Sequence, residues 1–343
     1  MEQTNSSSQY FVGIDVGGTN IKCGIVNGAG ETLARVQSPT NAKLGPECGV
    51  ETITSAVRQA LAESKISLEE ILQIGVATPG TMDIQAGLLL DPPNLPGWQN
   101  FPIRQRIADY FEKPTILQND ANAAAYGEFW QGAAQNARSL VFWTLGTGIG
   151  CGIIIGDTII EGANSHGSEC GHIIIEMDNG RPCDTGQYGT LEAYASAKSL
   201  IRRCQEALGA GAKSILHEQS RKEELTPLLI AKAAEAGDQL ANDLIMESAR
   251  CLGVGTTSLI HTINPDMVLF GGAMTFGRHE SELGRRFLQK IRDEVKLRAF
   301  PVPAEKTIID YALLGGNAGY IGAAGCAKLN YDSLLKEDPT LSS

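Results

Sequence analysis

The sequence predicts an α/β protein built of two lobes. Its 343 residues exceed what a single hydrophobic core normally serves. Short apolar runs that end in glycine turns alternate with stretches of helical period, which is typical of a parallel or mixed sheet covered by helices. A weak internal repeat is the third observation. Residues 14–19 align with residues 143–148, a period of about 128 residues, which indicates either a duplicated β-hairpin domain or a chance similarity of two glycine turns.

The first part of the chain is rich in strands. An amphipathic helix is expected where Val50, Ile53, Val57 and Leu61 recur at helical spacing, and an Ala-rich helix follows Asp120. Short helical spacing also marks 103–110. The expected strands are 10–15, 21–26, 32–37, 71–77 and 115–117.

The second part begins with two strands and then becomes mainly helical. The expected strands are 140–144, 151–155, 267–270 and 307–311. The expected helices are 191–206, 225–236, 238–262, 283–297 and 317–328.

Composition excludes several classes of partner. The net charge is −11 and no basic stripe is present, so nucleic acid is not expected as the main partner. The longest apolar stretches are too short to cross a bilayer, so no membrane partner is expected. Eight cysteines are scattered without a short-spaced framework, which indicates reduced thiols and a cytoplasmic protein.

Asp15-Val16-Gly17-Gly18-Thr19 lies where one strand turns into the next. Adjacent glycines let backbone N–H groups approach a phosphate without Cβ clashes, and the Thr19 hydroxyl adds a donor. Asp15 can hold Mg²⁺, and Lys22 can reach a terminal phosphate. The alternative is an ordinary hairpin turn with no ligand.

Three further glycine turns follow strands, at Gly146-Thr147-Gly148, Gly271-Gly272 and Gly315-Gly316. No G-x-x-x-x-G-K-[ST] motif occurs, and the Gly146 turn enters a strand instead of a helix, so neither a P-loop nor a dinucleotide fold is indicated. Glycine turns from two lobes suit an ATP cleft of another architecture.

Polar residues at four positions have the chemistry of a sugar kinase site. Asp120 lies between a strand and a helix, where it is either the N-cap or the base that accepts a hydroxyl proton in phosphoryl transfer. Glu169, His172 and Glu192 can read sugar hydroxyls. Otherwise His172 is a satisfied core histidine, and Glu192 is a first-turn carboxylate that favours the helix dipole.

Together these residues resemble the ROK family (repressors, open reading frames and kinases) of the actin/hexokinase-like superfamily, over about residues 10–328. The resemblance implies a two-lobed actin-like ATPase or ribonuclease H-like fold of hexokinase type, with duplicated β-sheet domains and a cleft between them. The smaller lobe would comprise 10–121, completed by the helix at about 317–328, and the larger lobe 122–316. The resemblance also implies a homodimer formed through the larger lobe.

The matching motifs assign roles by resemblance. The motif from Asp15 through Lys22 matches the family's first phosphate motif, the Gly146 turn matches the second, and Gly271-Gly272 resembles the adenosine-side turn. ATP and Mg²⁺ are therefore expected. The residues implied to bind the cofactor are Asp15, Gly17, Gly18, Thr19, Lys22, Gly146, Thr147, Gly148, Gly271 and Gly272, with Mg²⁺ near Asp15.

The hexose site is also implied by resemblance. Asn119-Asp120-Ala121-Asn122 matches the segment with the catalytic aspartate, and Glu169-Cys170-Gly171-His172 matches the E-x-G-H sugar motif. Residues 93–98 resemble a segment of the family's glucokinases, so glucose ranks first, ahead of N-acetylmannosamine, N-acetylglucosamine and fructose. The residues implied to bind the hexose are Gly80, Asn94, Asn119, Asp120, Glu169, His172 and Glu192, with Asp120 as the base.

One departure from the family concerns zinc. The family's usual motif is C-x-C-G-x-x-G-C-x-E, with the E-x-G-H histidine as fourth ligand. Here Thr185 and Thr190 replace two of the thiolates, and only Cys183 and His172 remain. Two ligands do not make a closed tetrahedral site, so no structural zinc is expected.

Two rival functions come from other classes. A sugar-sensing repressor would need a DNA-binding module, and only nine polar residues precede the first expected strand. A catalytically dead sugar-binding protein is disfavoured because Asp120 and Lys22 are both present. The phosphate donor, ATP or polyphosphate, stays open.

Overall fold

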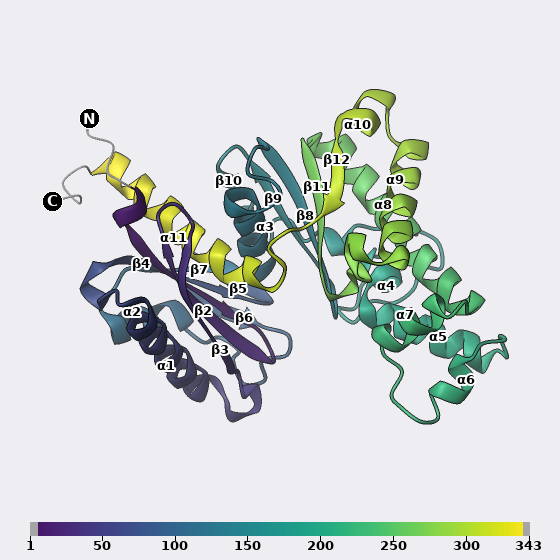
Figure 1. Ribbon diagram of the computed structural model, residues 1–343, viewed down its shortest axis with the longest axis horizontal. Coiled ribbons are helices and arrows are strands. Elements are labelled where there is room, and N and C mark those ends of the chain that lie inside the picture. The colour runs from purple at the N-terminus through teal and green to yellow at the C-terminus, as the bar shows by residue number, and fades with distance from the viewer. Residues whose placement is uncertain (1–5, 339–343) are drawn as a thin grey trace. The chain divides into compact units, whose positions relative to one another are not determined.

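A computed structural model describes residues 6–338, which form two compact units. The first unit comprises the residues up to Asn136, Gly152–Ser168, and the residues from Leu313 onward. The second comprises Ala137–Cys151 and Glu169–Ala312. Figure 1 labels most of the helices and strands of both units.

A five-stranded mixed sheet forms the centre of the first unit, in the order β3-β2-β1-β4-β7. The strands β1, β2 and β3 pair antiparallel, whereas β4 and β7 join parallel to β1. Its strands are β1 (Tyr10–Val16), β2 (Asn20–Asn27), β3 (Thr32–Pro39), β4 (Ile71–Thr78) and β7 (Thr115–Asn119). All five were expected from the sequence.

Helices cover both faces of this sheet. The helices α1 (Pro46–Ser64) and α2 (Ile103–Phe111) contact one face, and α11 (Ala318–Glu337) contacts the other, with α3 (Asp120–Gln131) packed on α11. The period of two along β1 decides which residues face which helices. Val12, Ile14 and Val16 join the core beneath α1, whereas Phe11 packs with α11.

The helix α11 lies unusually close to the sheet. A Cβ atom on Gly13 would stand 1.9 Å from the Tyr320 carbonyl oxygen, and one on Gly75 would stand 1.9 Å from the Ala323 oxygen. The helix itself has Gly322, whose Cβ would stand 1.6 Å from the Ala123 oxygen of α3. No side chain fits at these contacts, so glycine is required for the helix to approach.

The second sheet repeats the topology of the first, in the order β10-β9-β8-β11-β12. The strands β8, β11 and β12 are parallel, and β10 pairs antiparallel with β9, as β3 does with β2. Its strands are β8 (Ser139–Leu145), β9 (Ile149–Ile155), β10 (Thr158–Ile159), β11 (Met267–Gly272) and β12 (Ile308–Tyr311). The weak sequence repeat is thus a duplication of the sheet.

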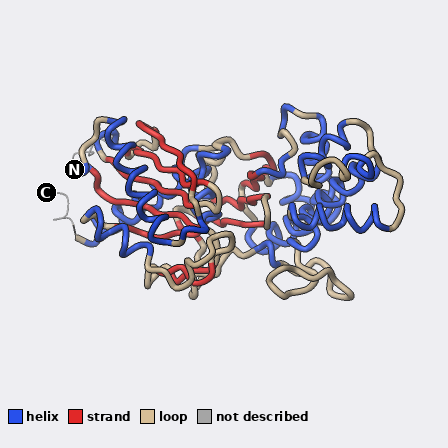
Figure 2. Tube along the Cα trace, turned by 90° about the horizontal axis from the view of Figure 1, so that it is seen from below, coloured by secondary structure: helices blue, strands red, loops and turns tan. Residues whose placement is uncertain are grey.

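Helices make up most of the rest of the second unit, as the blue tube in Figure 2 shows. They are α4 (Glu192–Ala195), α5 (Ala197–Gly209), α6 (Leu216–Gln219), α7 (Pro227–Glu235), α8 (Gln239–Ile263), α9 (Glu282–Arg298) and α10 (Pro301–Lys306). The single helix expected over 191–206 is wrong. Ser196 is extended, and its side chain caps α5 by accepting the Ser199 N–H.

Some short elements were not expected from the sequence. The strands β5 (Thr81–Asp83) and β6 (Leu88–Asp91) form a separate hairpin, and α11 continues to Glu337, beyond the expected end at 328. The 3₁₀ turns are Ser6–Ser8, Ala42–Leu44, Leu68–Glu70, Cys170–His172, Ala273–Thr275, Arg278–Glu280 and Gly315–Asn317. No helix in residues 6–338 is long and apolar enough to cross a membrane.

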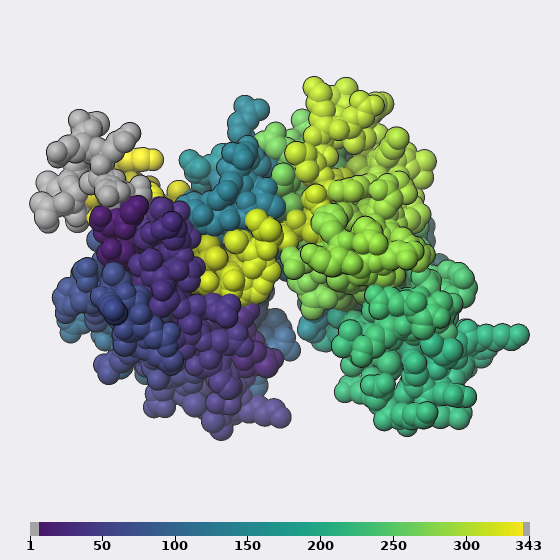
Figure 3. Space-filling model, in the orientation of Figure 1, coloured from purple at the N-terminus to yellow at the C-terminus, as the bar shows by residue number. Residues whose placement is uncertain are grey.

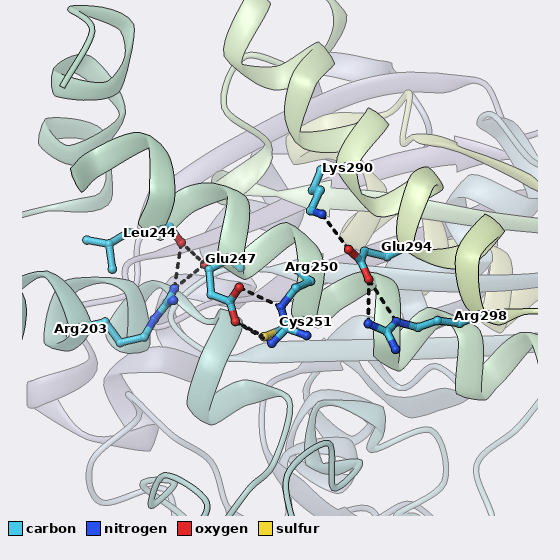
Figure 4. A network of polar contacts seen from close by, with 9 residues as sticks. Arg203, Leu244, Glu247, Arg250, Cys251, Lys290, Glu294 and Arg298 are labelled. Carbon is cyan, nitrogen blue, oxygen red and sulfur yellow. Dashed lines mark hydrogen bonds and ion pairs between the residues drawn. The ribbon is translucent and has the colours of Figure 1, made fainter. Parts of the chain in front are cut away.

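Two buried charged residues, Arg203 and Glu294, lie among the helices of the second unit. Figure 3 shows α9 and α10, in yellow-green, at the surface of this unit. Within α9, Glu294 is only 5% exposed and pairs with Lys290 at 2.7 Å and with Arg298 at 3.0 Å (Figure 4). On α5 the buried Arg203 donates to the Ser248 hydroxyl of α8 at 2.6 Å. These charges have partners within the helical layer, which indicates a structural role.

Candidate active site

Several expected site residues follow the carboxyl ends of β1, β4 and β7. These three strands are parallel, and their register pairs Asp15 with Ala77 and Thr78 with Asn119. The carboxyl ends of parallel strands meet at one edge of a sheet, where α/β proteins bind ligands. Asp15, Asn119 and Asp120 are therefore brought to the same edge of the sheet.

The corner between β7 and α3 decides the role of Asp120 in the helix. The N-cap is Asn119, whose Oδ1 accepts the N–H groups of Ala121 and Asn122 at 2.9 and 3.2 Å. Asp120 is the first residue of the helix, and its Oδ1 also lies 2.9 Å from the Ala121 nitrogen. The alternative that Asp120 is the N-cap is therefore wrong, and Asn119 has a capping role that sequence reasoning missed.

A second pair at this corner was also missed. The buried Gln118 accepts the Asn119 N–H at 2.8 Å through its carbonyl oxygen and donates its amide to Glu161 at 2.7 Å. Glu161 lies 43 residues along the chain, so no spacing in the sequence links the two. The pair holds the strand end from which Asp120 projects.

The glycine turn between β1 and β2 is closed by its own backbone and by Thr40. Gly17 donates its N–H to the Asn20 oxygen at 2.9 Å, and the Thr40 hydroxyl donates to the Gly17 oxygen at 2.6 Å. A Cβ on Gly18 would stand 2.7 Å from the Cβ of Asn94, so the turn lies directly against this residue. Thr19 is exposed at the tip.

The segment that contains Asn94 also contacts Gly80. Gly80 has φ +89°, and its Cβ would stand 2.5 Å from the Pro92 Cα. Asn94 itself has φ +65°, a conformation that asparagine tolerates better than most residues. The structure thus brings Asn94, Gly80 and the Gly17-Gly18 turn together in the first unit. The resemblance suggested only that Asn94 and Gly80 lie at the same sugar, so the contact with the glycine turn was not expected.

Asp15 and Lys22 face each other across β1 and β2. Their closest charged atoms are 3.9 Å apart, and the Lys22 Nζ donates to the Gly316 carbonyl at 2.8 Å. Burial raises the pKa of Asp15, and Lys22 opposes this in part. Because its charge is poorly solvated, a further cation at this carboxylate would be favoured. A carboxylate at the phosphate turn fits Mg²⁺, which binds through few carboxylates together with substrate phosphates.

The second unit holds two of the expected glycine turns, Gly146–Gly148 and Gly271-Gly272, at one sheet edge. In the turn after β8, Gly146 donates its N–H to the Gly148 oxygen at 3.0 Å and accepts the Ala197 N–H at 3.0 Å, and Thr147 is exposed at its tip. Parallel pairing sets Gly271-Gly272 beside Thr144-Leu145. Gly272 has φ +91°, and its Cβ would stand 2.3 Å from the Leu145 oxygen. The two expected nucleotide turns of this unit are therefore neighbours.

Glu192 is held against the Gly146–Gly148 turn. Its Oε2 accepts the Ile149 N–H at 2.8 Å, and a Cβ on Gly148 would stand 2.5 Å from that oxygen. Its Oε1 accepts the Cys183 thiol at 3.3 Å. Glu192 is the first residue of a helix, as expected, but α4 has only 4 residues and its dipole is small. The side-chain contacts with Ile149 and Cys183 therefore define the position of the Glu192 carboxylate.

The E-x-G-H motif forms a single 3₁₀ turn, Cys170–His172, with Glu169 as its N-cap. Gly171 packs on β9, since its Cβ would stand 2.2 Å from the Ile149 oxygen. Glu169 is exposed. The His172 Nδ1 is shielded from solvent, and no hydrogen-bond partner for it lies among residues 6–338. A satisfied core histidine is therefore the wrong interpretation, and this atom is suited to receive a ligand.

The residues at the family's zinc positions have other partners. Cys183 contacts Glu192, Thr185 donates to the Gln187 side chain, and Thr190 accepts the Ala193 N–H at 3.3 Å. Threonine hydroxyls are not zinc ligands in structural sites, where thiolates and imidazoles dominate. No group of three His, Cys, Asp or Glu suited to a metal occurs in residues 6–338. The residues present do not fit zinc, and its absence from the protein stays a prediction.

Comparison with known proteins places the chain in a family. The ROK family model matches residues 11–329. This chain belongs to the ROK family. A glucokinase of Halalkalibacterium halodurans is 32% identical over 335 residues, which are 97% of this chain and 99% of that protein. A xylose repressor of Caldicellulosiruptor bescii is 29% identical over 93% of this chain and 78% of its own length.

A solved structure confirms the fold class. The ROK family glucokinase of Streptomyces griseus, in complex with glucose and AMPPNP, superposes with a TM-score of 0.75 at 30% identity, over 93% of this chain and 99% of that one. The fold is thus the two-lobed, actin-like ATPase fold of ROK sugar kinases, as the sequence predicted. The duplicated sheets described above are its framework.

Proposed function

We propose that this ROK protein is an ATP-dependent hexose kinase that converts glucose to glucose 6-phosphate. The observation that carries the proposal is the polar cluster of the second unit. Glu192 and the Cys170–His172 turn both contact the strand start at Ile149, and the buried His172 Nδ1 has no partner in residues 6–338. A cluster of carboxylates with an unpaired imidazole nitrogen suits a ligand with several hydroxyls, which both donate and accept.

Asp120 acts as the base in this proposal. It accepts the proton of the sugar 6-hydroxyl as that oxygen attacks the γ-phosphorus of ATP in line with the leaving ADP. Its place at the first turn of α3, after a strand end, holds the carboxylate on a rigid element. Asn94, Glu169, His172 and Glu192 orient the ring, with Gly80 lying against it. Asn119 holds the corner that carries Asp120 and also contacts the sugar.

The glycine turns serve the phosphate donor. The N–H groups at Gly17-Gly18 and at Gly146–Gly148 stabilise the charge on the transferred group, and Gly271-Gly272 lies beside the nucleoside. Lys22 supplies a cation. Mg²⁺ held near Asp15 would offset charge on the β- and γ-phosphates.

The relatives support glucose and ATP. One is a glucokinase at 32% identity, and a structure at 30% identity contains glucose and AMPPNP. The xylose repressor at 29% identity supports a second candidate, a regulator that binds a sugar without turnover. The two candidates differ in whether the protein phosphorylates the sugar it binds.

A substrate panel tests the proposal. The purified protein is assayed with glucose, fructose, N-acetylmannosamine and N-acetylglucosamine, each with ATP or polyphosphate and Mg²⁺. Sugar 6-phosphate is measured directly. The proposal predicts the highest kcat/KM for glucose with ATP. Sugar binding by calorimetry without any phosphorylated product would favour the regulator.

A further inference from the structure

A backbone turn holds Cys183 in place. The Cys183 N–H donates to the Gln187 oxygen at 2.8 Å, and the Gly186 N–H donates to the Cys183 oxygen at 3.0 Å. Pro182 and Tyr188 form an antiparallel bridge across the same turn. The Cys183 side chain is only 8% exposed. Its sulfur is therefore positioned by main-chain hydrogen bonds that need no metal.

The loop that contains this turn is docked on the segment after His172. Leu191 donates its N–H to the Ile173 oxygen at 2.9 Å, and Thr190 bridges to Ile174. Gly189 has φ +72°, and its Cβ would stand 1.8 Å from the Glu176 oxygen, so only glycine permits the contact. This docking joins Cys183 to the segment of the proposed sugar site that also holds His172.

Both carboxylate oxygens of Glu192 have one donor each from this region. The Ile149 N–H reaches Oε2 at 2.8 Å, and the Cys183 S–H reaches Oε1 at 3.3 Å. One donor fixes an oxygen, but the carboxylate can still rotate about it. Two donors on different elements fix the plane of the group. A residue oriented before its ligand arrives costs less entropy on binding.

The cationic side chains near Glu192 do not orient its carboxylate. A cavity of about 120 Å³ lies beside Glu192 and is lined in part by Cys183, Lys198 and Arg202. Lys198 pairs with Asp184 at 2.7 Å, and Arg202 donates to the Pro182 carbonyl at 3.1 Å. Within residues 6–338 the structure shows no ion pair to Glu192.

We propose that Cys183 is a positioning residue, whose thiol orients Glu192 for the sugar. This inference rests on the proposed function, because it takes Glu192 as a sugar ligand. A position that supplies a zinc ligand in the family motif thus supplies a hydrogen-bond donor here. The link joins the loop to the ligand directly and needs no metal.

The first test compares Cys183→Ala with Cys183→Ser. In Cys183→Ala, the Glu192 carboxylate loses the hydrogen bond from the thiol. The glucose KM should therefore rise about five- to ten-fold, with kcat within about two-fold of wild type. Serine keeps a donor, so Cys183→Ser should restore the KM to within about three-fold. The matched control is Cys251→Ala, which removes a thiol 3.7 Å from the Glu247 carboxylate on α8 (Figure 4) and should leave the KM unchanged.

Glu192 variants separate this inference from the proposed function. Glu192→Ala should raise the glucose KM, and adding Cys183→Ala should raise it no further, because the two residues act as a unit. If Glu192→Ala raises the KM while Cys183→Ala leaves it at the wild-type value, the positioning role is overturned and the kinase proposal stands. If Glu192→Ala leaves the KM unchanged, the sugar role of Glu192 fails, and the positioning role fails with it.

A chemical test covers the case in which Cys183→Ala does not fold. Methyl methanethiosulfonate transfers a methylthio group to the thiolate sulfur and releases methanesulfinate, so the S–H donor is lost. The glucose KM of the wild-type protein should rise and return after dithiothreitol. The Cys183→Ser protein should show no change in glucose KM, because it lacks the target thiol. Its other cysteines remain, so it also controls for reaction at those sites. An equal rise in both proteins, or no rise in either, would overturn the proposal.

Discussion

Glu128 offers the sharpest prediction about what holds the first unit together. This carboxylate of α3 is 0% exposed and accepts three backbone N–H groups. They come from Ala133 at 2.9 Å, Leu313 at 3.1 Å and Leu314 at 2.7 Å. Leu313 and Leu314 begin the stretch that leads into α11, the helix packed on β1. The side chain therefore fixes the entry of α11 by hydrogen bonds to a charged acceptor.

Glu128→Ala would leave all three donors without this acceptor. Each buried donor left unpaired costs about 1–3 kcal/mol. Glu128 is buried, but Leu313 is exposed, so water can reach some of the freed donors, and we expect a loss of about 3–5 kcal/mol in the free energy of unfolding. Glu128→Gln keeps one carbonyl oxygen and should lose about half as much. The exposed Glu63 of α1 provides the control, since Glu63→Ala should change stability by less than about 0.5 kcal/mol.

Urea unfolding followed by circular dichroism measures these differences. We expect the urea midpoint to fall in the order wild type, Glu128→Gln, Glu128→Ala, and we expect Glu63→Ala to keep the wild-type midpoint. A Glu128→Ala protein within about 1 kcal/mol of wild type would refute it, because three charged hydrogen bonds would then contribute almost nothing.

Two further predictions concern charge. Lys22→Met removes the cation that is fixed on the Gly316 carbonyl, so the KM for ATP should rise at least about ten-fold with the glucose KM little changed, as steady-state kinetics would show. Equal effects on both substrates would argue against a phosphate role. For Glu294, burial acts to raise the pKa, but the hydrogen bonds from Lys290 and Arg298 outweigh it and hold the pKa below its usual range. Because the pKa is lowered in the folded state, the wild-type protein should be more stable than Glu294→Gln at neutral pH. This difference in the free energy of unfolding should disappear as the pH falls through the folded-state pKa, which unfolding curves from pH 7 to 3 would measure. A difference that stays constant down to pH 3 would contradict this assignment.

The strands and the glycine turns could be predicted from the sequence because their signals are local. Apolar runs that end in Gly17-Gly18 or Gly146–Gly148 mark strand ends, and each of the nine expected strands was found within a few residues of its expected bounds, whereas β5, β6 and β10 were not expected. The duplicated topology was also visible, since the repeat preserves the strand–turn–strand unit at the start of each sheet. Periodicity and turn chemistry need no knowledge of distant contacts.

Other features depend on contacts between distant segments. The helix expected over 191–206 has no local breaker, and the break at Ser196 coincides with a tertiary bond in which Ala197 donates its N–H to the Gly146 oxygen. The N-cap at the β7–α3 corner could be either Asn119 or Asp120, because both residue types cap helices and they are adjacent. The thiol of Cys183 at Glu192 has no sequence signature, since it depends on how a loop folds back.

The central claim is that Asp120 is the base of a hexose kinase. Asp120→Asn keeps the side-chain oxygen beside the Ala121 N–H, so the corner should fold as before. The decisive measurement is kcat for glucose phosphorylation by ATP, together with glucose affinity from calorimetry and the exposed Asp157→Asn as control. We predict a fall in kcat of at least about 100-fold in Asp120→Asn, with glucose affinity within a few-fold of wild type. A kcat within ten-fold of wild type would contradict the claim.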